Sequence, residues 1–211
     1  MTAMPRRAAL DDDDQPPAGR VRHAGPGTGR PGGPDAWLRL EEEIGRELPA
    51  DYKSIIDAYA PVQLHGHLYL TSRADLGEMI RDESETWNEW RAWEPRELAP
   101  DEDPRVICNR PQIVFGTPDG LIPLADTDQG ACIYPAPEVH GFPDGLVVQG
   151  PDGDWAGHPM TFAEWLYRYL IGEERAGWGC AAHYPGPVLL EYPASEPGQP
   201  AREVYGPERG M

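Results

Sequence analysis

Four large apolar side chains, spaced three or four residues apart, mark the start of the part of this chain that can fold. Trp37, Leu40, Ile44 and Leu48 share one face of a helix, for which Asp35 is a suitable N-cap. The acidic residues 41–43 fall mainly off that face. The pattern therefore predicts an amphipathic helix from about residue 35, with its apolar stripe buried.

Three further segments show helical spacing. A helix beginning near residue 50 would bury Ile55, Ile56 and Tyr59. The segment from Asp75 to about Trp93 is helical until Pro95 ends it, and a late helix follows Thr161, with Glu164 three residues on as in a capping box. Gly172 would end this late helix.

Short strand-like runs, separated by Gly, Pro and Asp turns, lie between these helices. They are 62–64, 67–70, 112–115, 121–125, 131–134 and 146–149, with a possible edge strand at 188–192. Helices at the start, strands in the middle and one late helix predict a single α+β domain. Its central sheet would be mainly antiparallel, with the N-terminal helices and the late helix packed on it.

The two ends of the chain and one internal segment differ from this core. Residues 1–34 lack apolar periodicity and are predicted to be a disordered tail, while 35–192 form the domain and 193–211 a flexible C-terminal tail. Residues 94–111, rich in proline and acidic side chains, are predicted to form an exposed loop.

The charge lies on the predicted domain. The whole chain carries a formal net charge of −18, yet residues 1–34 have a net charge of +1. A strongly acidic surface repels nucleic acid and anionic membranes and speeds encounter with a basic partner, although solubility alone can also explain it. No segment is long and apolar enough to span a bilayer, and we expect a cytoplasmic protein.

The segment from Trp37 to Lys53, WLRLEEEIGRELPADYK, resembles the N-terminal signature of the Smi/Knr-like group in the SUKH superfamily. That signature has the form W-x-x-x-E-x-x-h-G, where h is apolar, followed by L-P-x-D-Y-K. The matching residues are Trp37, Glu41, Ile44, Gly45, Leu48, Pro49, Asp51, Tyr52 and Lys53. Residues 121–134 and 160–166 resemble later elements of the family, so the resemblance spans about residues 35–172.

The resemblance implies a binding fold without a general enzymatic activity or cofactor. Bacterial members are commonly encoded beside toxins and neutralise them by direct contact, while fungal relatives act as signalling scaffolds. We therefore expect an immunity protein against a cognate toxin, or alternatively a regulatory or scaffold protein. The signature residues themselves are expected to be structural, with Trp37, Ile44 and Leu48 in the core.

Other chemistry finds little support in the sequence. Asp126 to Gly130 begins like a calcium loop, but Gly130 and Pro137 stand where an EF-hand needs oxygen ligands. His65 and His67 would share one face of a strand without a third metal ligand. No nucleophile–base arrangement is recognisable, and the three cysteines are predicted to be reduced structural thiols. We expect no catalytic residue, metal or cofactor.

A partner surface is predicted around the end of the third helix. Trp87, Trp90 and Trp93 could complete the core or serve as interface anchors, and this choice stays open. Acidic residues of the following loop would steer a basic toxin domain. The predicted contacts are Trp90, Trp93, Glu97, Asp101, Glu102 and Asp103. The sequence does not fix the oligomeric state.

Overall fold

The structure is a computed structural model of the whole chain. It describes residues 35–91, 99–100, 102–151, 153–174, 176, 187–194 and 198–208, without the side chains of 90, 91, 207 and 208. The predicted tail 1–34 and the residues around Trp93 lie outside these ranges.

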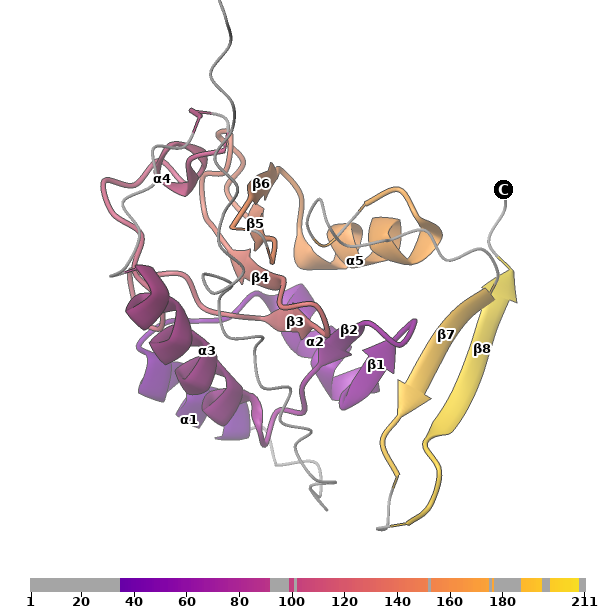
Figure 1. Cartoon of the computed structure of the whole chain (residues 1–211). Coiled ribbons are helices and arrows are strands. Elements are labelled where there is room, and N and C mark those ends of the chain that lie inside the picture. Colours follow the sequence, from indigo (N-terminus) through magenta and orange to yellow (C-terminus); the bar gives the residue numbers. More distant parts are fainter. Residues whose placement is uncertain are drawn as a thin grey trace, which may run out of the picture.

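The chain folds as one α+β domain, as the sequence predicted (Figure 1). Its elements are α1 (Asp35–Ile44), α2 (Ala50–Tyr59), β1 (Val62–Leu64), β2 (Leu68–Leu70), α3 (Leu76–Arg91), α4 (Pro104–Ile107), β3 (Ala125–Thr127), β4 (Cys132–Pro135), β5 (Leu146–Gln149), β6 (Trp155–His158), α5 (Phe162–Ile171), β7 (Pro187–Tyr192) and β8 (Arg202–Glu208). The eight strands form an antiparallel sheet in the order β6-β5-β4-β3-β2-β1-β7-β8. None of the described helices is long and apolar enough to cross a membrane.

The turn between α1 and α2 is fixed by the residues that carry the family resemblance. Gly45 has a positive φ of 70°, a conformation that glycine adopts at low cost. The Glu41 carboxylate accepts a hydrogen bond from the Leu48 backbone N–H at 2.9 Å and contacts Lys53 Nζ at 2.6 Å. Trp37 is also buried. Ile44 and Leu48 are buried with it, as the sequence predicted for these core residues.

Two polar contacts of α2 tie the helix to distant parts of the domain. The Tyr52 hydroxyl, fully buried, donates to the Leu124 carbonyl at 2.8 Å. The Asp51 carboxylate accepts from the Ala163 N–H at the start of α5, also at 2.8 Å. As predicted, Thr161 caps α5 by accepting from the Glu164 N–H, and Gly172 ends it with a φ of 84°. Helix α5 is thereby held against α2.

The sheet has a separate hydrophobic core on each face. The larger core joins α1, α2, α5 and the first turns of α3 to side chains such as Leu68, Ile133 and Val148. The smaller core lies on the other face, over β4 to β6, where residues 107–121 cover Tyr134, Val147 and Trp155. The smaller core ends at β4. The other five strands, which follow in the sheet order β3, β2, β1, β7 and β8, therefore have less apolar cover on that face.

Several predicted loops and strands differ in the structure. Within the predicted loop 94–111, Pro104–Ile107 form α4, and Ile107 and Cys108 are buried in the smaller core. Residues 112–115 form only an isolated bridge from Phe115 to Leu121 in place of a strand. His65 and His67 lie in the turn between β1 and β2, not within a strand.

The last described strand lies in the segment that the sequence assigned to a flexible tail. Residues 202–208 form β8, which pairs with β7 and becomes the edge of the sheet (Figure 1). The Arg202 guanidinium lies 4.6 Å from the centre of the Tyr192 ring. Backbone pairing and this contact stabilise a segment whose Gly206 and Pro207 are poor indicators of a strand.

Candidate functional site: a polar row across one sheet face

The predicted partner contacts fall partly outside the described residues. Trp93, Glu97 and Asp101 lie outside them, and Trp90 is placed by its backbone alone, within α3. Glu102 is exposed. The contact role of these residues stays a prediction.

Asp103 has a structural role of its own. Its residue is only 7% exposed, and its carboxylate caps α4 by accepting from the Arg105 N–H at 2.8 Å. The Arg105 guanidinium also donates to this carboxylate, at 2.9 Å from Nε. Proline at the first position of a helix, preceded by aspartate, is a recognisable cap signal. The carboxylate is therefore already engaged within the chain.

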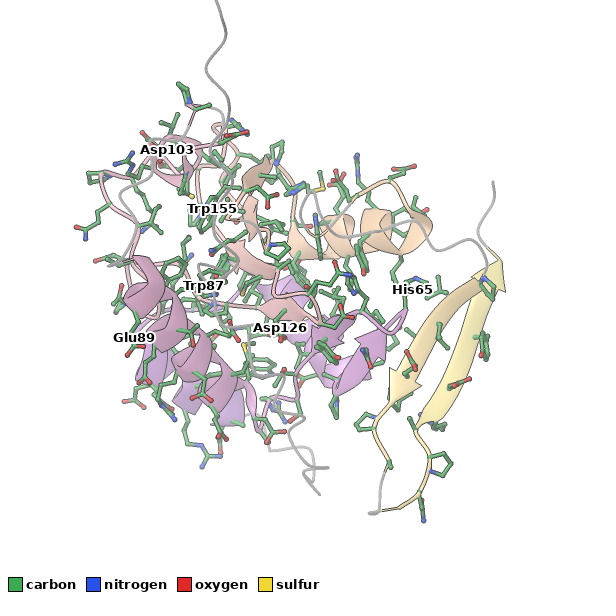
Figure 2. The ribbon with its side chains drawn as sticks, viewed as in Figure 1. His65, Trp87, Glu89, Asp103, Asp126 and Trp155 are labelled. Carbon is green, nitrogen blue, oxygen red and sulfur yellow. The ribbon has the colours of Figure 1, made fainter. Side chains whose placement is uncertain are left out.

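For Trp87, the structure decides between the two roles predicted for the tryptophans, in the core or at an interface. Its ring packs against the smaller core, and Figure 2 shows it pointing from α3 toward the sheet while Glu89 points away. Trp87 thus completes the core, which was one of the two roles predicted for these tryptophans.

A single row of side chains crosses all eight strands on the face that carries the smaller core. Partners in antiparallel register point to the same face, so the pairings can be followed from one strand to the next. From β8 to β6 the row consists of Glu203, Glu191, Gln63, Tyr69, Asp126, Cys132, Gln149 and Trp155. We call it the cross-sheet row.

The cross-sheet row changes character along its length. At the β4 to β6 end, Cys132, Gln149 and Trp155 are buried under residues 107–121. On β3, β2, β1 and β7 the members of the row are partly exposed, and on β8 Glu203 is exposed. Its charged members are all carboxylates in this second half, so the open end of the row is acidic.

Asp126 stands at the boundary between the two halves, in the middle of the sheet (Figure 2). Burial and, to a smaller extent, the nearby Glu83 carboxylate on α3 raise its pKa to about 7, against the opposing effect of a backbone hydrogen bond. Burial also raises the pKa of Glu83, against a hydrogen bond from Trp87. A carboxylate that titrates near neutral pH inside a row of polar groups is typical of functional sites.

Glu191 and Glu203 oppose each other directly across β7 and β8. Oε2 of Glu191 is buried and has no hydrogen-bond partner, whereas Glu203 accepts from the Tyr205 hydroxyl at 2.7 Å. The Tyr69 pKa is raised by burial and then by Asp128, Asp126 and Glu191. These groups therefore form one continuous region of negative potential.

The buried end of the row contains a second side chain with an unsatisfied hydrogen-bonding group. Gln149 is fully buried and accepts from the Tyr134 hydroxyl at 3.2 Å, but its amide NH₂ has no partner. Beside it, burial raises the pKa of the Cys132 thiol well above its usual value, which keeps the sulfur protonated and unreactive. Cys132 and Cys108 are buried and not joined in a disulfide, as expected for reduced structural thiols, while Cys180 lies outside the described residues.

The described residues contain no group of three side chains suited to a metal ion. His67 pairs with Asp128, and His65 accepts a long hydrogen bond, 3.4 Å, from the Leu189 N–H. Both histidines thus support the β1–β2 turn. The cross-sheet row suits recognition of cations by carboxylates and amide groups.

Sequence reasoning missed this row, although it used most of the strands that carry it. Alternation within a strand shows which residues share a face, but the register between strands depends on contacts that are distant in the sequence. Comparisons with protein-family models, curated proteins and solved structures found no match to this chain.

Proposed function

We propose that this chain is a non-catalytic acidic binding protein that recognises a basic protein partner through the open end of the cross-sheet row. The observation that carries the proposal is the pair Glu191 and Glu203. Like charges directly opposite in a sheet destabilise it, and a buried carboxylate oxygen without a partner adds to that cost. A lysine or arginine from a partner, placed beside the pair, would offset the repulsion between the two carboxylates.

We further propose that the partner is a bacterial toxin, which the chain neutralises as an immunity protein. The resemblance of residues 37–53 to the Smi/Knr-like signature supports this choice, together with the net charge of −18. The acidic surface would speed association with a basic toxin domain, and contacts in the row would slow its release. A regulatory or scaffold protein that recruits a cellular partner is the alternative.

The first experiment compares three forms of the full chain as bait in lysate of the source cells. They are the wild type, Glu191→Gln with Glu203→Gln, and a control with Glu42→Gln and Glu78→Gln. The control changes the net charge by the same amount at exposed positions on α1 and α3. We expect the wild type and the control to retain the same basic protein, and the row variant to lose it at moderate salt.

The captured protein is then purified and its affinity measured by calorimetry. We expect the row variant to bind at least about ten-fold more weakly than the control. Equal affinity of the two variants would rule out the cross-sheet row as the contact surface. Removing the Glu191–Glu203 repulsion also affects stability. We therefore expect the row variant to unfold at a higher urea concentration than the wild type at low salt. Such a result would show that the weaker binding is not caused by misfolding.

Expression of the captured protein in a test strain distinguishes the two roles. Growth arrest that is reversed by co-expression of the wild-type chain supports the immunity role. A partner that leaves growth unchanged would favour the scaffold alternative.

A further inference from the structure

An open cavity of about 340 Å³ lies beside α4, away from the open end of the cross-sheet row. Val106, Ile107 and Asn109 line it from α4 and the following turn, and Glu138, His140 and Gly141 line it from the connection between β4 and β5. Its volume is at the lower end of the range for small-molecule sites, ~300–1,000 Å³. Asp103, which is labelled in Figure 2, caps α4, and α4 forms one side of this cavity.

The backbone around this cavity is unusual. Among the described residues, four that are not glycine have a positive φ, and three of them, Asn109, Glu138 and His140, line the cavity. Asn109 has a structural explanation, because it follows the end of α4 and asparagine adopts this conformation readily. Glu138 has a φ of 72°, a left-handed conformation that glutamate rarely adopts and that would favour glycine at this position.

The connection that carries Glu138 is held firmly. Gly141 N–H donates to the Glu138 carbonyl at 3.0 Å, Phe142 N–H donates to the Val139 carbonyl at 2.9 Å, and Val139 is fully buried. Glu138 itself is exposed. The chain thus keeps an exposed carboxylate at a strained and well-anchored position, and strain of this kind is concentrated at functional sites.

Gly157 on β6 makes room for the imidazole of His140. A Cβ atom at position 157 would lie 2.9 Å from His140 Nε2 and 2.7 Å from Ile107 Cγ2. His140 is exposed as a residue, but the Nε2 edge of its ring therefore lies close to β6. Glycine at this position allows His140 and Ile107, two of the lining residues, to approach the strand closely.

We propose that this cavity binds an organic cation, a guanidinium or ammonium group carried on a short apolar stem. Glu138 supplies the negative charge, the Asn109 amide and the His140 ring supply hydrogen-bond acceptors, and Val106, 60% exposed, with Ile107 supplies apolar contact for the stem. The cation is either a free amine or a basic side chain of a protein. This site is separate from the cross-sheet row, and either proposal can fail without the other.

The test is an NMR titration of the full ¹⁵N-labelled chain with three probes. N-acetyl-arginine methylamide represents a side chain in a protein, agmatine a free amine, and N-acetyl-citrulline methylamide is the uncharged control. We expect saturable shifts of the Asn109 and Gly141 amides with the first or second probe and none with the third. Tighter binding of the arginine derivative identifies a protein side chain as the ligand, and tighter binding of agmatine identifies a free amine.

Two variants separate the site from general attraction to an acidic surface. Glu138→Gln keeps the shape and should weaken binding at least about ten-fold, while Glu173→Gln, an exposed control at the end of α5, should leave it unchanged. Equal weakening by both variants, or shifts spread evenly over the acidic surface, would overturn the proposal.

A third variant tests the strain that led to it. Glu138→Gly should raise the urea midpoint of unfolding and abolish binding, because it removes the strain and the carboxylate together. A lower midpoint would show that Glu138 is retained for folding, and the functional interpretation of its strain would then be wrong.

Discussion

Replacing Asp126 with asparagine tests the electrostatics at the centre of the cross-sheet row. Asparagine has nearly the same shape and keeps an oxygen for the backbone hydrogen bond, but it cannot ionise. In the folded protein, burial and Glu83 raise the Asp126 pKa from 3.8 to about 7. When Asp126 ionises near neutral pH, the folded wild-type protein therefore loses stability, whereas the variant, which cannot ionise at this position, does not.

The sign and size follow from proton linkage. Between pH 4 and pH 7 the folded state binds more protons at Asp126 than the unfolded state, so the wild type loses stability as the pH rises. A shift of about three pKa units corresponds to ~4 kcal/mol, at ~1.4 kcal/mol per unit. Asp126 is partly exposed, and water that reaches the carboxylate reduces this value, so we expect about 2 kcal/mol at pH 8 and close to zero at pH 4.

The assay is urea unfolding followed by circular dichroism at four pH values from 4 to 8. Asp126→Asn should be more stable than the wild type by a margin that grows through pH 5–7 and then levels off. Asp144→Asn, which removes a carboxylate from an exposed turn, is the control. A margin that does not change with pH, or a variant less stable than the wild type at pH 8, would refute the reasoning.

Three further predictions concern other contacts. Tyr52→Phe leaves the buried Leu124 carbonyl without its donor and should lower the free energy of unfolding by ~1–2 kcal/mol, measured by urea denaturation. Gly45→Ala should cost about 1–3 kcal/mol in the same assay, because φ is 70° and the new Cβ would lie 2.7 Å from Pro118 Cγ; an unchanged midpoint would mean that the turn rearranges freely. Glu203→Gln should stabilise the chain at low salt and lose this effect in 1 M salt, because exposed charges are then screened; a salt-independent gain would point to a cause other than repulsion from Glu191.

The parts of the fold that could be predicted are those with local signals. The apolar spacing from Trp37 to Leu48 and the cap at Thr161 predicted α1 and the start of α5, because both depend on residues within a few positions of each other. Strand β1 was also predicted with its observed bounds. Local patterns thus sufficed for the α+β class.

Strands β6 and β8 could not be predicted in this way. Trp155–His158 contains Gly157, which allows close packing with His140 and Ile107, and β8 contains both glycine and proline. Each becomes a strand through pairing with a neighbour. Asp103 shows the opposite case, since its cap signal was present in the sequence, but its acidic surroundings suggested an exposed loop.

The candidate site depends on register, which no local pattern fixes. Tyr69, Asp126 and Cys132 come from three strands and become neighbours only when the strands pair with the observed alignment. Glu83 joins them from α3, and its effect on Asp126 appears only after the helix has docked. The sequence could therefore predict an acidic protein without placing its acidic face.

The raised pKa of Asp126 also restricts the kind of partner that can cover the open end of the row. An apolar surface placed there would exclude water from Asp126, raise its pKa further and take up a proton from solution. A basic surface would lower the Asp126 pKa below 7 and release a proton instead. Calorimetry at pH 7 in two buffers of different ionisation enthalpy measures the direction of this transfer, so the sign of the proton exchange distinguishes a basic partner from an apolar one without a structure of the complex.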